Sequence, residues 1–398
     1  MNLSQTPSSE RLHIGFFGMR NAGKSSLVNA VTGQALSLVS EVKGTTTDPV
    51  KKAMELLPLG PVVIIDTPGM DDEGLLGEMR VSRAKAMLDM VNIAVLVVDA
   101  AQGMRQEDRA LLALMQLKKL PHVICYNKCD LLPVMPALEE NALCVSAATG
   151  EGVAALKEML GRFAGGKTEK KIVADLLEPG DLALLVVPVD EAAPKGRLIL
   201  PQQQTIRELL DHHMLAMVCQ DTEVRRTLEM VRPKLVITDS QAFGRVAADV
   251  PQDMPLTSFS ILFARYKGNL DMQIRGAAAM DRLQDGDRVL IAEGCTHHRQ
   301  CGDIGTVKIP NWMAQHTGKQ LVYEFSSGAD FPQDLSGFAL VVHCGGCTLT
   351  EQMMKARLSR AKEAGVPVVN YGMAIAHMHG ILRRSLQVFP DAAKLLEE

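Results

Sequence analysis

Short runs of apolar residues, separated by amphipathic stretches, organise the first part of the chain. The runs are continuous rather than alternating, which is typical of strands buried on both faces of a parallel sheet. They lie at residues 13–17, 62–65, 93–98 and 122–126. Residues 25–31 and 82–90 have helical patterns. Because each run ends in a polar loop, we predict a doubly wound α/β domain at residues 10–165, with ligands at the carboxyl ends of its strands.

The remaining apolar runs predict two further, smaller α/β domains. Glycines followed by charged residues predict a linker at 166–172, and the polar residues 1–9 predict a flexible tail. We expect a middle domain at 173–265 and a C-terminal domain at 266–398, whose strands form either one sheet or two. The strands are predicted at 182–189, 234–238, 288–292, 320–324, 338–343 and 367–370. The helices are predicted at 203–217, 223–231 and 351–364.

The composition is that of a folded protein, with 47% hydrophobic and 22% charged residues among 398 positions. Lys and Arg are spread along the chain and the formal net charge is −4, so we do not expect a nucleic-acid partner. No apolar run reaches the ~18–20 residues of a membrane span, and residues 1–10 lack the apolar stretch of a signal peptide. We therefore expect a cytoplasmic protein with no membrane partner, whose eight cysteines stay reduced.

The segment from Gly18 to Ser25, Gly-Met-Arg-Asn-Ala-Gly-Lys-Ser, fits the phosphate loop of nucleotide-binding proteins. It follows a predicted strand and opens a predicted helix, which is the context that such a loop requires. Glycines such as Gly18 and Gly23 let backbone N–H groups wrap the phosphates. Lys24 would reach the β- and γ-phosphates, and Ser25 would bind Mg²⁺.

Three further motifs follow in the order expected of a GTPase, each after a predicted strand. Asp66-Thr67-Pro68-Gly69 would place the Asp66 carboxylate near Mg²⁺ and the Gly69 amide near the γ-phosphate. Asn127-Lys128-Cys129-Asp130 would select guanine, because the Asp130 carboxylate accepts from the ring N–H and the exocyclic amine. Ser146-Ala147 follows a short predicted strand at 142–145 and fits the loop that backs the base.

A first switch is expected at Gly44-Thr45-Thr46-Thr47-Asp48. Thr46, or alternatively Thr45, would close over Mg²⁺ and the γ-phosphate and release them on hydrolysis. A capped polar loop without a switch function is the competing interpretation. The motifs together predict GTP and Mg²⁺ as ligands. The residues expected to carry hydrolysis are Lys24, Thr46, Asp66 and Gly69.

These motifs resemble those of the MnmE and Era group of GTPases. The likeness rests on Asn21-Ala22-Gly23-Lys24-Ser25-Ser26 and on the Gly-Thr-Thr-x-Asp switch. In potassium-activated members, an asparagine at the position of Asn21 helps to bind a monovalent cation, so the resemblance implies K⁺ as a further ligand. Met70 stands where some relatives have a water-positioning glutamine. Acidic residues of the second switch could take over that role or be solvated surface charges; they are Asp71, Asp72, Glu73 and Glu78.

Soft metal ligands follow two predicted strands of the last domain. Cys295 follows the strand at 288–292, and Cys344-Gly345-Gly346-Cys347 follows the strand at 338–343. Since the ends of parallel strands share an edge, the three thiolates can converge. Three thiolates suit a 4Fe–4S cluster with one iron free for another ligand, whereas zinc is the alternative metal. His297 and His343 could complete either site. A redox pair and small buried cysteines are the non-metal alternatives.

The order Cys-x-His, 45 residues, then His-Cys-x-x-Cys behind such a GTPase resembles the HydF family of FeFe-hydrogenase maturation GTPases over essentially the whole chain. The resemblance implies a homodimeric scaffold, joined through its middle domain, that holds a 4Fe–4S cluster on three cysteines. It further implies that two radical-SAM maturases supply a diiron unit, which the scaffold passes to apo-FeFe-hydrogenase. The competing hypothesis is an RNA- or ribosome-associated GTPase whose C-terminal metal domain is structural.

Overall fold

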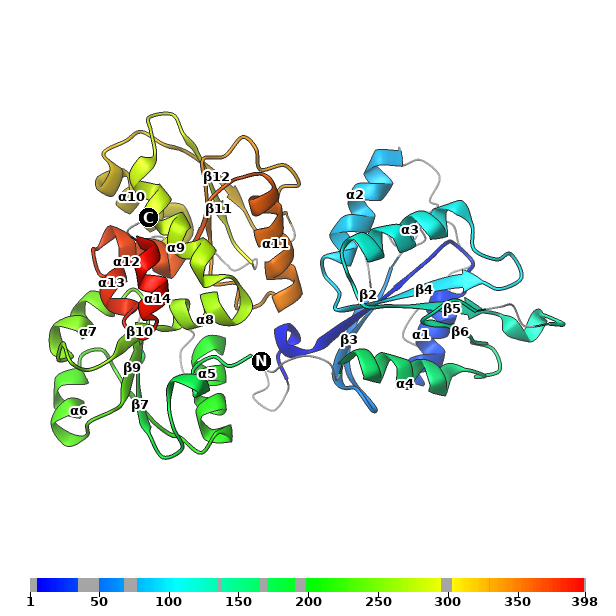
Figure 1. Ribbon diagram of the computed structural model, residues 1–398, viewed down its shortest axis with the longest axis horizontal. Helices are drawn as coiled ribbons and strands as arrows, with labels where there is room; N and C mark the ends of the chain where they lie inside the picture. The colour runs from blue at the N-terminus through cyan, green and yellow to red at the C-terminus, as the bar shows by residue number, and fades with distance from the viewer. Residues whose placement is uncertain are drawn as a thin grey trace. The chain divides into compact units, whose positions relative to one another are not determined.

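The protein divides into two compact units, Met1–Thr168 and Glu169–Glu398, which are drawn in Figure 1. The computed structural model describes residues 6–34, 50–67, 77–134, 138–164, 170–189, 198–294, 303–328 and 330–396. At the end of the expected tail, Ser8–Glu10 form a short 3-10 helix. Among the described helices, none combines the length and the apolar character that a membrane crossing requires.

The first unit contains a six-stranded sheet in the order β2-β3-β1-β4-β5-β6. All neighbouring strands run parallel except β2, which is antiparallel to β3. The strands are β1 (Leu12–Phe17), β2 (Val50–Leu56), β3 (Gly60–Asp66), β4 (Ile93–Asp99), β5 (His122–Asn127) and β6 (Ala142–Cys144). The helices are α1 (Lys24–Thr32), α2 (Gly77–Leu88), α3 (Gln106–Leu117) and α4 (Val153–Ala164), with a 3-10 turn η2 (Cys129–Leu131).

Helices cover both faces of this sheet, as a doubly wound fold requires. Val28 of α1 and Leu156 of α4 belong to one buried cluster, together with alternate residues of the strands. Leu88 of α2 and Met115 of α3 belong to a second cluster with the intervening strand residues. Because apolar side chains leave both faces of the central strands, their sequences are continuous apolar runs. The predicted α/β class with an N-terminal parallel-sheet domain is confirmed.

The second unit contains two separate parallel sheets of four strands each, in the orders β10-β9-β7-β8 and β12-β11-β13-β14. The strands of the first are β7 (Leu182–Val186), β8 (Leu215–Cys219), β9 (Leu235–Thr238) and β10 (Leu256–Ser258). Those of the second are β11 (Arg288–Ala292), β12 (Val322–Ser326), β13 (Leu340–His343) and β14 (Val368–Asn370). The sequence had left open whether these strands form one sheet or two.

The helices around the first of these sheets are α5 (Leu200–Asp211), α6 (Val224–Met230), α7 (Phe243–Asp249) and α8 (Phe259–Lys267), with a 3-10 turn η3 (Ala174–Leu176). The helices that follow are α9 (Leu270–Ala279), α10 (Ile309–Thr317), α11 (Glu351–Glu363), α12 (Tyr371–Met378), α13 (Leu382–Ser385) and α14 (Pro390–Ala393). Short turns complete the unit: η4 (Met280–Arg282), η5 (Ile304–Lys308) and η6 (Lys394–Leu396). Ile172, at the end of the expected linker, is already buried in this unit.

One predicted helix, at residues 203–217, is wrong in its second half. Helix α5 ends at Asp211, and the chain then turns at His213, whose φ is 61°. The residues Leu215–Cys219 form strand β8, which pairs with β7. The sequence Leu-Ala-Met-Val-Cys is apolar throughout and compatible with either element, so local pattern alone extended the helix through the turn.

Helix α13 connects the last part of the chain to the loop that precedes β10. The guanidinium of Arg384 donates to the carbonyl oxygens of Gln252 (2.8 Å), Pro251 (2.7 Å) and Met254 (3.1 Å). One side chain thus satisfies three backbone acceptors of a loop more than a hundred residues earlier in the sequence. The two sheets of the second unit are therefore tied together by the carboxyl-terminal helices.

Candidate nucleotide and metal sites

The phosphate loop connects β1 to α1, and its glycines are required by close backbone approach. Gly23 caps α1 with a φ of 87°, and a Cβ atom there would lie 2.2 Å from Nδ2 of Asn127. Gly18 has a φ of 142°, and its Cβ would lie 2.2 Å from the carbonyl oxygen of Val97. Any L side chain would clash at both positions. The loop can therefore turn its backbone N–H groups inward only with glycine at these places.

Lys24 lies inside the loop rather than in solvent, with 7% of its surface exposed. Its Nζ donates to the carbonyl oxygens of Gly18 (3.0 Å) and Met19 (2.8 Å). These bonds hold a positive charge at the mouth of the loop, where the helix N-terminus also favours an anion. The ammonium is thus positioned for a phosphate before any nucleotide binds.

Ser25 and Asp66 form the part of the site that fits Mg²⁺. The Ser25 hydroxyl donates to Oδ2 of Asp66 at 2.7 Å. The other carboxylate oxygen of Asp66 is buried and has no hydrogen-bond partner among the described residues. A buried acceptor of this kind is costly unless a cation or water satisfies it. Hydroxyl and carboxylate oxygens are ligands suited to Mg²⁺, so these residues fit the ion.

Asn127 links the phosphate loop to the base-binding loops. Its Nδ2 donates to the carbonyl oxygen of Ala22 at 3.0 Å, and its Oδ1 accepts from the backbone N–H of Ala147 at 3.1 Å. The side chain is buried, so both bonds are shielded from water. The loops carrying Ala22, Asn127 and Ala147 are therefore fixed relative to one another by one amide group.

The remaining base-side residues surround this amide. Lys128 forms an ion pair with Asp99, with 2.6 Å between Nζ and Oδ2. Ser146 is buried, and its hydroxyl accepts from the N–H of Thr149 at 3.1 Å. Asp130 lies exposed in η2, available to a base. Asp99 escaped the sequence analysis, although its place as the polar last residue of β4 could have indicated it.

Exchanging Asp130 for asparagine should change nucleotide preference. We expect the preference for GTP over xanthosine triphosphate to fall by about 100-fold or more, because the amide presents a donor where guanine needs two acceptors. Competition binding of the two nucleotides measures the effect. Glu140→Gln, at another exposed carboxylate of the same unit, is the matched control. An unaltered preference in Asp130→Asn would exclude Asp130 from base selection.

The segment Cys344–Cys347, called the cysteine loop below, lies at the carboxyl ends of two paired parallel strands. Strand β11 pairs with β13 so that Ala292 lies opposite His343. Just beyond, Sγ of Cys344 accepts from the backbone N–H of Gly294 (3.0 Å) and of Gly346 (3.4 Å). Such bonds stabilise a thiolate, which is the metal-binding form of cysteine. The structure thus brings the residue before Cys295 to Cys344, as the predicted shared sheet edge requires.

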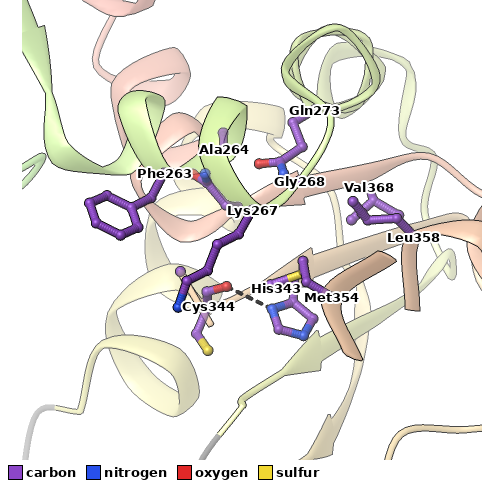
Figure 2. A pocket seen from close by; sticks show the side chains of 12 residues that line it. Phe263, Ala264, Lys267, Gly268, Gln273, His343, Cys344, Met354, Leu358 and Val368 are labelled. Atoms are coloured by element: carbon purple, nitrogen blue, oxygen red, sulfur yellow. Dashed lines mark hydrogen bonds between the residues drawn. The ribbon is translucent and has the colours of Figure 1, made fainter. Parts of the chain in front are cut away.

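Lys267 adds positive charge to this loop. The lysine is buried at the end of α8, and its Nζ donates to the carbonyl oxygens of Cys347 (3.1 Å) and Leu349 (3.2 Å). Residues of α8, β13 and α11 line a pocket here, and Figure 2 shows the Lys267 side chain reaching across it toward Cys344. Cys344 lines the pocket, and both Cys344 and Cys347 are half-buried. The buried ammonium therefore places positive charge at the backbone of this loop.

His343 is held by hydrogen bonds at both ring nitrogens. Its Nδ1 lies 2.6 Å from the carbonyl oxygen of Cys344, and its Nε2 lies 2.8 Å from Nη1 of Arg357. Since a guanidinium only donates, Nε2 accepts and Nδ1 carries the proton. Burial, followed by the Arg357 charge, lowers the pKa of His343 to about 4, so the ring is neutral. Both ring nitrogens of His343 therefore have partners here, and its role as a fourth ligand stays a prediction.

Arg357 is a second residue that the sequence analysis missed. It is buried, lies over the ring of Phe331 at 4.8 Å, and donates to the carbonyl oxygen of Gly328 as well as to His343. Burial lowers its pKa to about 10. Through His343 it positions the Cys344 carbonyl. Neither Arg357 nor Lys267 belongs to a motif, so no local signal set them apart.

Several predicted site residues lie outside the described residues: Thr46, Gly69, Cys295 and His297. Met70 and the acidic residues Asp71, Asp72 and Glu73 lie outside them too, as does the Glu78 side chain. Of the remaining predicted residues, Asn21 and Ser26 are exposed at the loop and on α1. Asn21 has a φ of 61°.

The loop, the Mg²⁺-fitting pair and the base-side residues define the first unit as a P-loop GTPase domain that binds GTP and Mg²⁺. Residues 13–128 match the family described as 50S ribosome-binding GTPase. Similar proteins include the tRNA modification GTPase MnmE of Nitrosomonas europaea, 33% identical over 161 residues, or 39% of this chain and 35% of that protein. MnmE of Xanthomonas oryzae is 37% identical over 157 residues, or 39% and 34%. The chain spans about a third of the length of these curated relatives.

The second unit is what distinguishes this chain from those GTPases. Residues 172–268 match the hydrogen maturase F dimerization domain, and residues 271–388 match the hydrogen maturase F tetramerization domain. Together these matches cover more than half of the sequence. The chain belongs to the hydrogen maturase F family, so the predicted resemblance is confirmed. Among solved structures, Aquifex aeolicus Era bound to GDP·AlF4⁻ aligns at 18% identity with a TM-score of 0.34, covering 60% of this chain and 97% of that one.

Proposed function

We propose that this protein is a GTP-hydrolysing scaffold for FeFe-hydrogenase maturation, which holds a 4Fe–4S cluster and delivers a diiron precursor to apo-hydrogenase. The observation that carries the proposal is the contact between the Gly294 N–H and the Cys344 thiol. It joins the two cysteine-bearing segments at one sheet edge in a chain of the hydrogen maturase F family. Family membership supports the maturation role.

In this proposal Cys295, Cys344 and Cys347 hold the cluster. The backbone N–H groups of Gly294 and Gly346 donate to the Cys344 sulfur, and Lys267 supplies positive charge beside Cys347. A cluster bound by three cysteines would offer one iron to a non-protein ligand. Such an open position suits a carrier, because cargo can attach there and leave. His297 remains a candidate for the fourth ligand.

We further propose that the protein forms a homodimer through its middle domain. Strand β8 is an edge of the β10-β9-β7-β8 sheet, so one side of its backbone has no strand neighbour within that sheet. Its side chains Leu215 and Val218 are 58% and 46% exposed. An exposed apolar edge strand favours pairing with another chain. The partners proposed from the family are apo-FeFe-hydrogenase and two radical-SAM maturases that supply the diiron unit.

The maturation role is tested with protein made anaerobically alongside the two radical-SAM maturases. We expect brown protein with about four irons per chain, a reduced-cluster EPR signal, and activation of apo-hydrogenase on mixing. The control is Cys344→Ser protein made in the same way. One zinc per chain without iron would instead indicate a structural metal domain. If iron-loaded protein never activates apo-hydrogenase, the proposed cluster binding stands and the proposed delivery of the diiron precursor is refuted.

We also propose that Asn21 helps to bind K⁺ as an activator of hydrolysis. Replacing Na⁺ by K⁺ at equal ionic strength should then raise the GTPase rate by about tenfold or more, a fraction of the 10³–10⁵-fold that an arginine finger supplies. Asn21→Gly should abolish the K⁺ effect. Glycine tolerates the φ of 61° found here, so this substitution removes the side-chain oxygen and spares the loop. A rate indifferent to K⁺ in the unsubstituted protein contradicts the cation site.

A further inference from the structure

Two histidines and one aspartate converge on the surface of the second unit, on three different elements. Nε2 of His316 in α10 lies 2.8 Å from Oδ1 of Asp281 in η4. Nε2 of His377 in α12 lies 3.0 Å from Oδ1 and 3.1 Å from Oδ2 of the same carboxylate. One ligand atom from each residue can be chosen so that all lie within 4.8 Å of one another. None of these three residues belongs to the cysteine loop.

The nitrogen–oxygen spacing of this group is close to that of a first-row metal site. Zinc–nitrogen and zinc–carboxylate bonds are about 2.0–2.2 Å long, so tetrahedral ligand atoms lie about 3.3 Å apart. The observed nitrogen–oxygen distances of 2.8–3.1 Å therefore need to widen by only a few tenths of an ångström. Two imidazoles and one carboxylate are also a ligand set suited to zinc and to related transition ions.

The backbone positions of the three ligands are fixed by buried neighbours. Met280 precedes Asp281, Met313 lies one turn before His316, and Met373 lies one turn before His377. All three methionines are fully buried in one cluster of the C-terminal core. The ligand side chains themselves stay partly accessible, at 24% for His316, 17% for His377 and 53% for Asp281. An ion can therefore reach the site, and a fourth position stays open to water.

We propose that Asp281, His316 and His377 bind a divalent first-row transition-metal ion, with Zn²⁺ fitting the ligand set best. On binding, the ion takes the place of the protons through which the two Nε2 atoms contact the carboxylate. The ion then links η4, α10 and α12 through one centre. This site differs from the cysteine site in chemistry, because it offers nitrogen and oxygen and no sulfur.

A natural probe lies beside the proposed site. Trp312, the only tryptophan of the chain, is one helical turn before His316 on α10. Its ring contacts that of His379 edge to face at a centroid distance of 5.6 Å. Co²⁺ bound by His316 would be close enough to quench the fluorescence of Trp312. Cobalt on thiolates gives intense charge-transfer absorption, which a nitrogen and oxygen site does not.

The test titrates Co²⁺ into untagged, full-length protein whose cysteine site is already loaded with iron, without nucleotide or Mg²⁺. We expect saturable quenching of Trp312 without thiolate charge transfer, reversed by Zn²⁺. Losing an outer partner of a metal ligand already weakens binding by about 10–100-fold. His316→Ala and His377→Ala should therefore each raise the dissociation constant by at least about tenfold.

His379→Ala is the matched control, since it removes a neighbouring imidazole that contacts the same tryptophan but lies outside the three ligands. We expect its dissociation constant to stay within about twofold, inside ordinary surface-substitution effects. Asp281→Asn keeps the size and the acceptor of the side chain and loses the anionic ligand, so it tests the site if a histidine variant unfolds. Co²⁺ affinity unaltered in folded His316→Ala or Asp281→Asn protein overturns the proposal. Thiolate-to-cobalt charge-transfer absorption as the sole signal would also overturn the proposal.

Discussion

Alanine at Lys24 should reduce the rate of GTP hydrolysis by about 10²–10³-fold, the usual cost of removing one transition-state charge partner. The structure already holds the Lys24 ammonium within the loop, on the carbonyl oxygens of Gly18 and Met19. Alanine leaves those acceptors in place. It removes the positive charge that would stabilise the negative charge developing on the γ-phosphate during hydrolysis. Single-turnover hydrolysis with saturating nucleotide measures the loss directly.

Lys51→Ala is the control for this experiment, because Lys51 is an exposed lysine on β2 of the same sheet. It should leave the rate within about twofold. Because the cysteine loop lies in the other compact unit, Lys24→Ala protein should keep its full iron content. A Lys24→Ala rate near that of the unsubstituted protein would remove Lys24 from catalysis. Lost iron in a folded variant would show that the two sites are coupled.

Serine at Cys344 should remove most of the iron from anaerobically prepared protein, from about four atoms per chain toward none. Two remaining cysteines are too few anchors for a cubane. The substitution also removes the sulfur that accepts the N–H groups of Gly294 and Gly346. Iron analysis and the EPR spectrum of the reduced protein provide the measurement.

Cys219→Ser gives the matched control, since Cys219 is a half-buried cysteine of β8 in the same unit. It should keep its iron. His343→Ala separates ligation from positioning: because both ring nitrogens are already engaged, we expect iron to be largely retained while the EPR line shape changes. Full iron in Cys344→Ser protein would contradict the cysteine assignment.

The strands of the first unit were predictable where they are buried on both faces. Strands β1, β4 and β5 are buried at nearly every position, and their short apolar runs end in polar loops, which favours strands over helices. Strand β2 was missed because it is an edge strand whose burial is confined almost entirely to Leu56. An edge strand with solvated side chains carries no apolar pattern, so only its pairing with β3 defines it.

The candidate sites likewise include residues that a local motif identifies and residues that only tertiary packing brings together. The phosphate loop is local, because Gly18, Gly23 and Lys24 act within one turn of chain, so spacing alone indicated it. The contact of Lys267 with the Cys347 carbonyl joins residues 80 positions apart, and it depends on how α8 packs beside the cysteine loop. Arg357 and His343 meet only because α11 returns over β13. Tertiary packing of this kind leaves no periodic signal in a single sequence.

The three hydrogen bonds of Arg384 bear on how the protein can be divided. The dimerization match ends at residue 268, and a fragment cut there retains Pro251, Gln252 and Met254 without the guanidinium that serves their carbonyls. Sequence order suggests two modules that could be exchanged independently. The bonding instead makes helix α13 a component of the middle domain. A truncation meant to remove only the cysteine-bearing part would therefore also leave three backbone carbonyls without their donor at the β10 edge of the middle-domain sheet, opposite the β8 edge proposed for association.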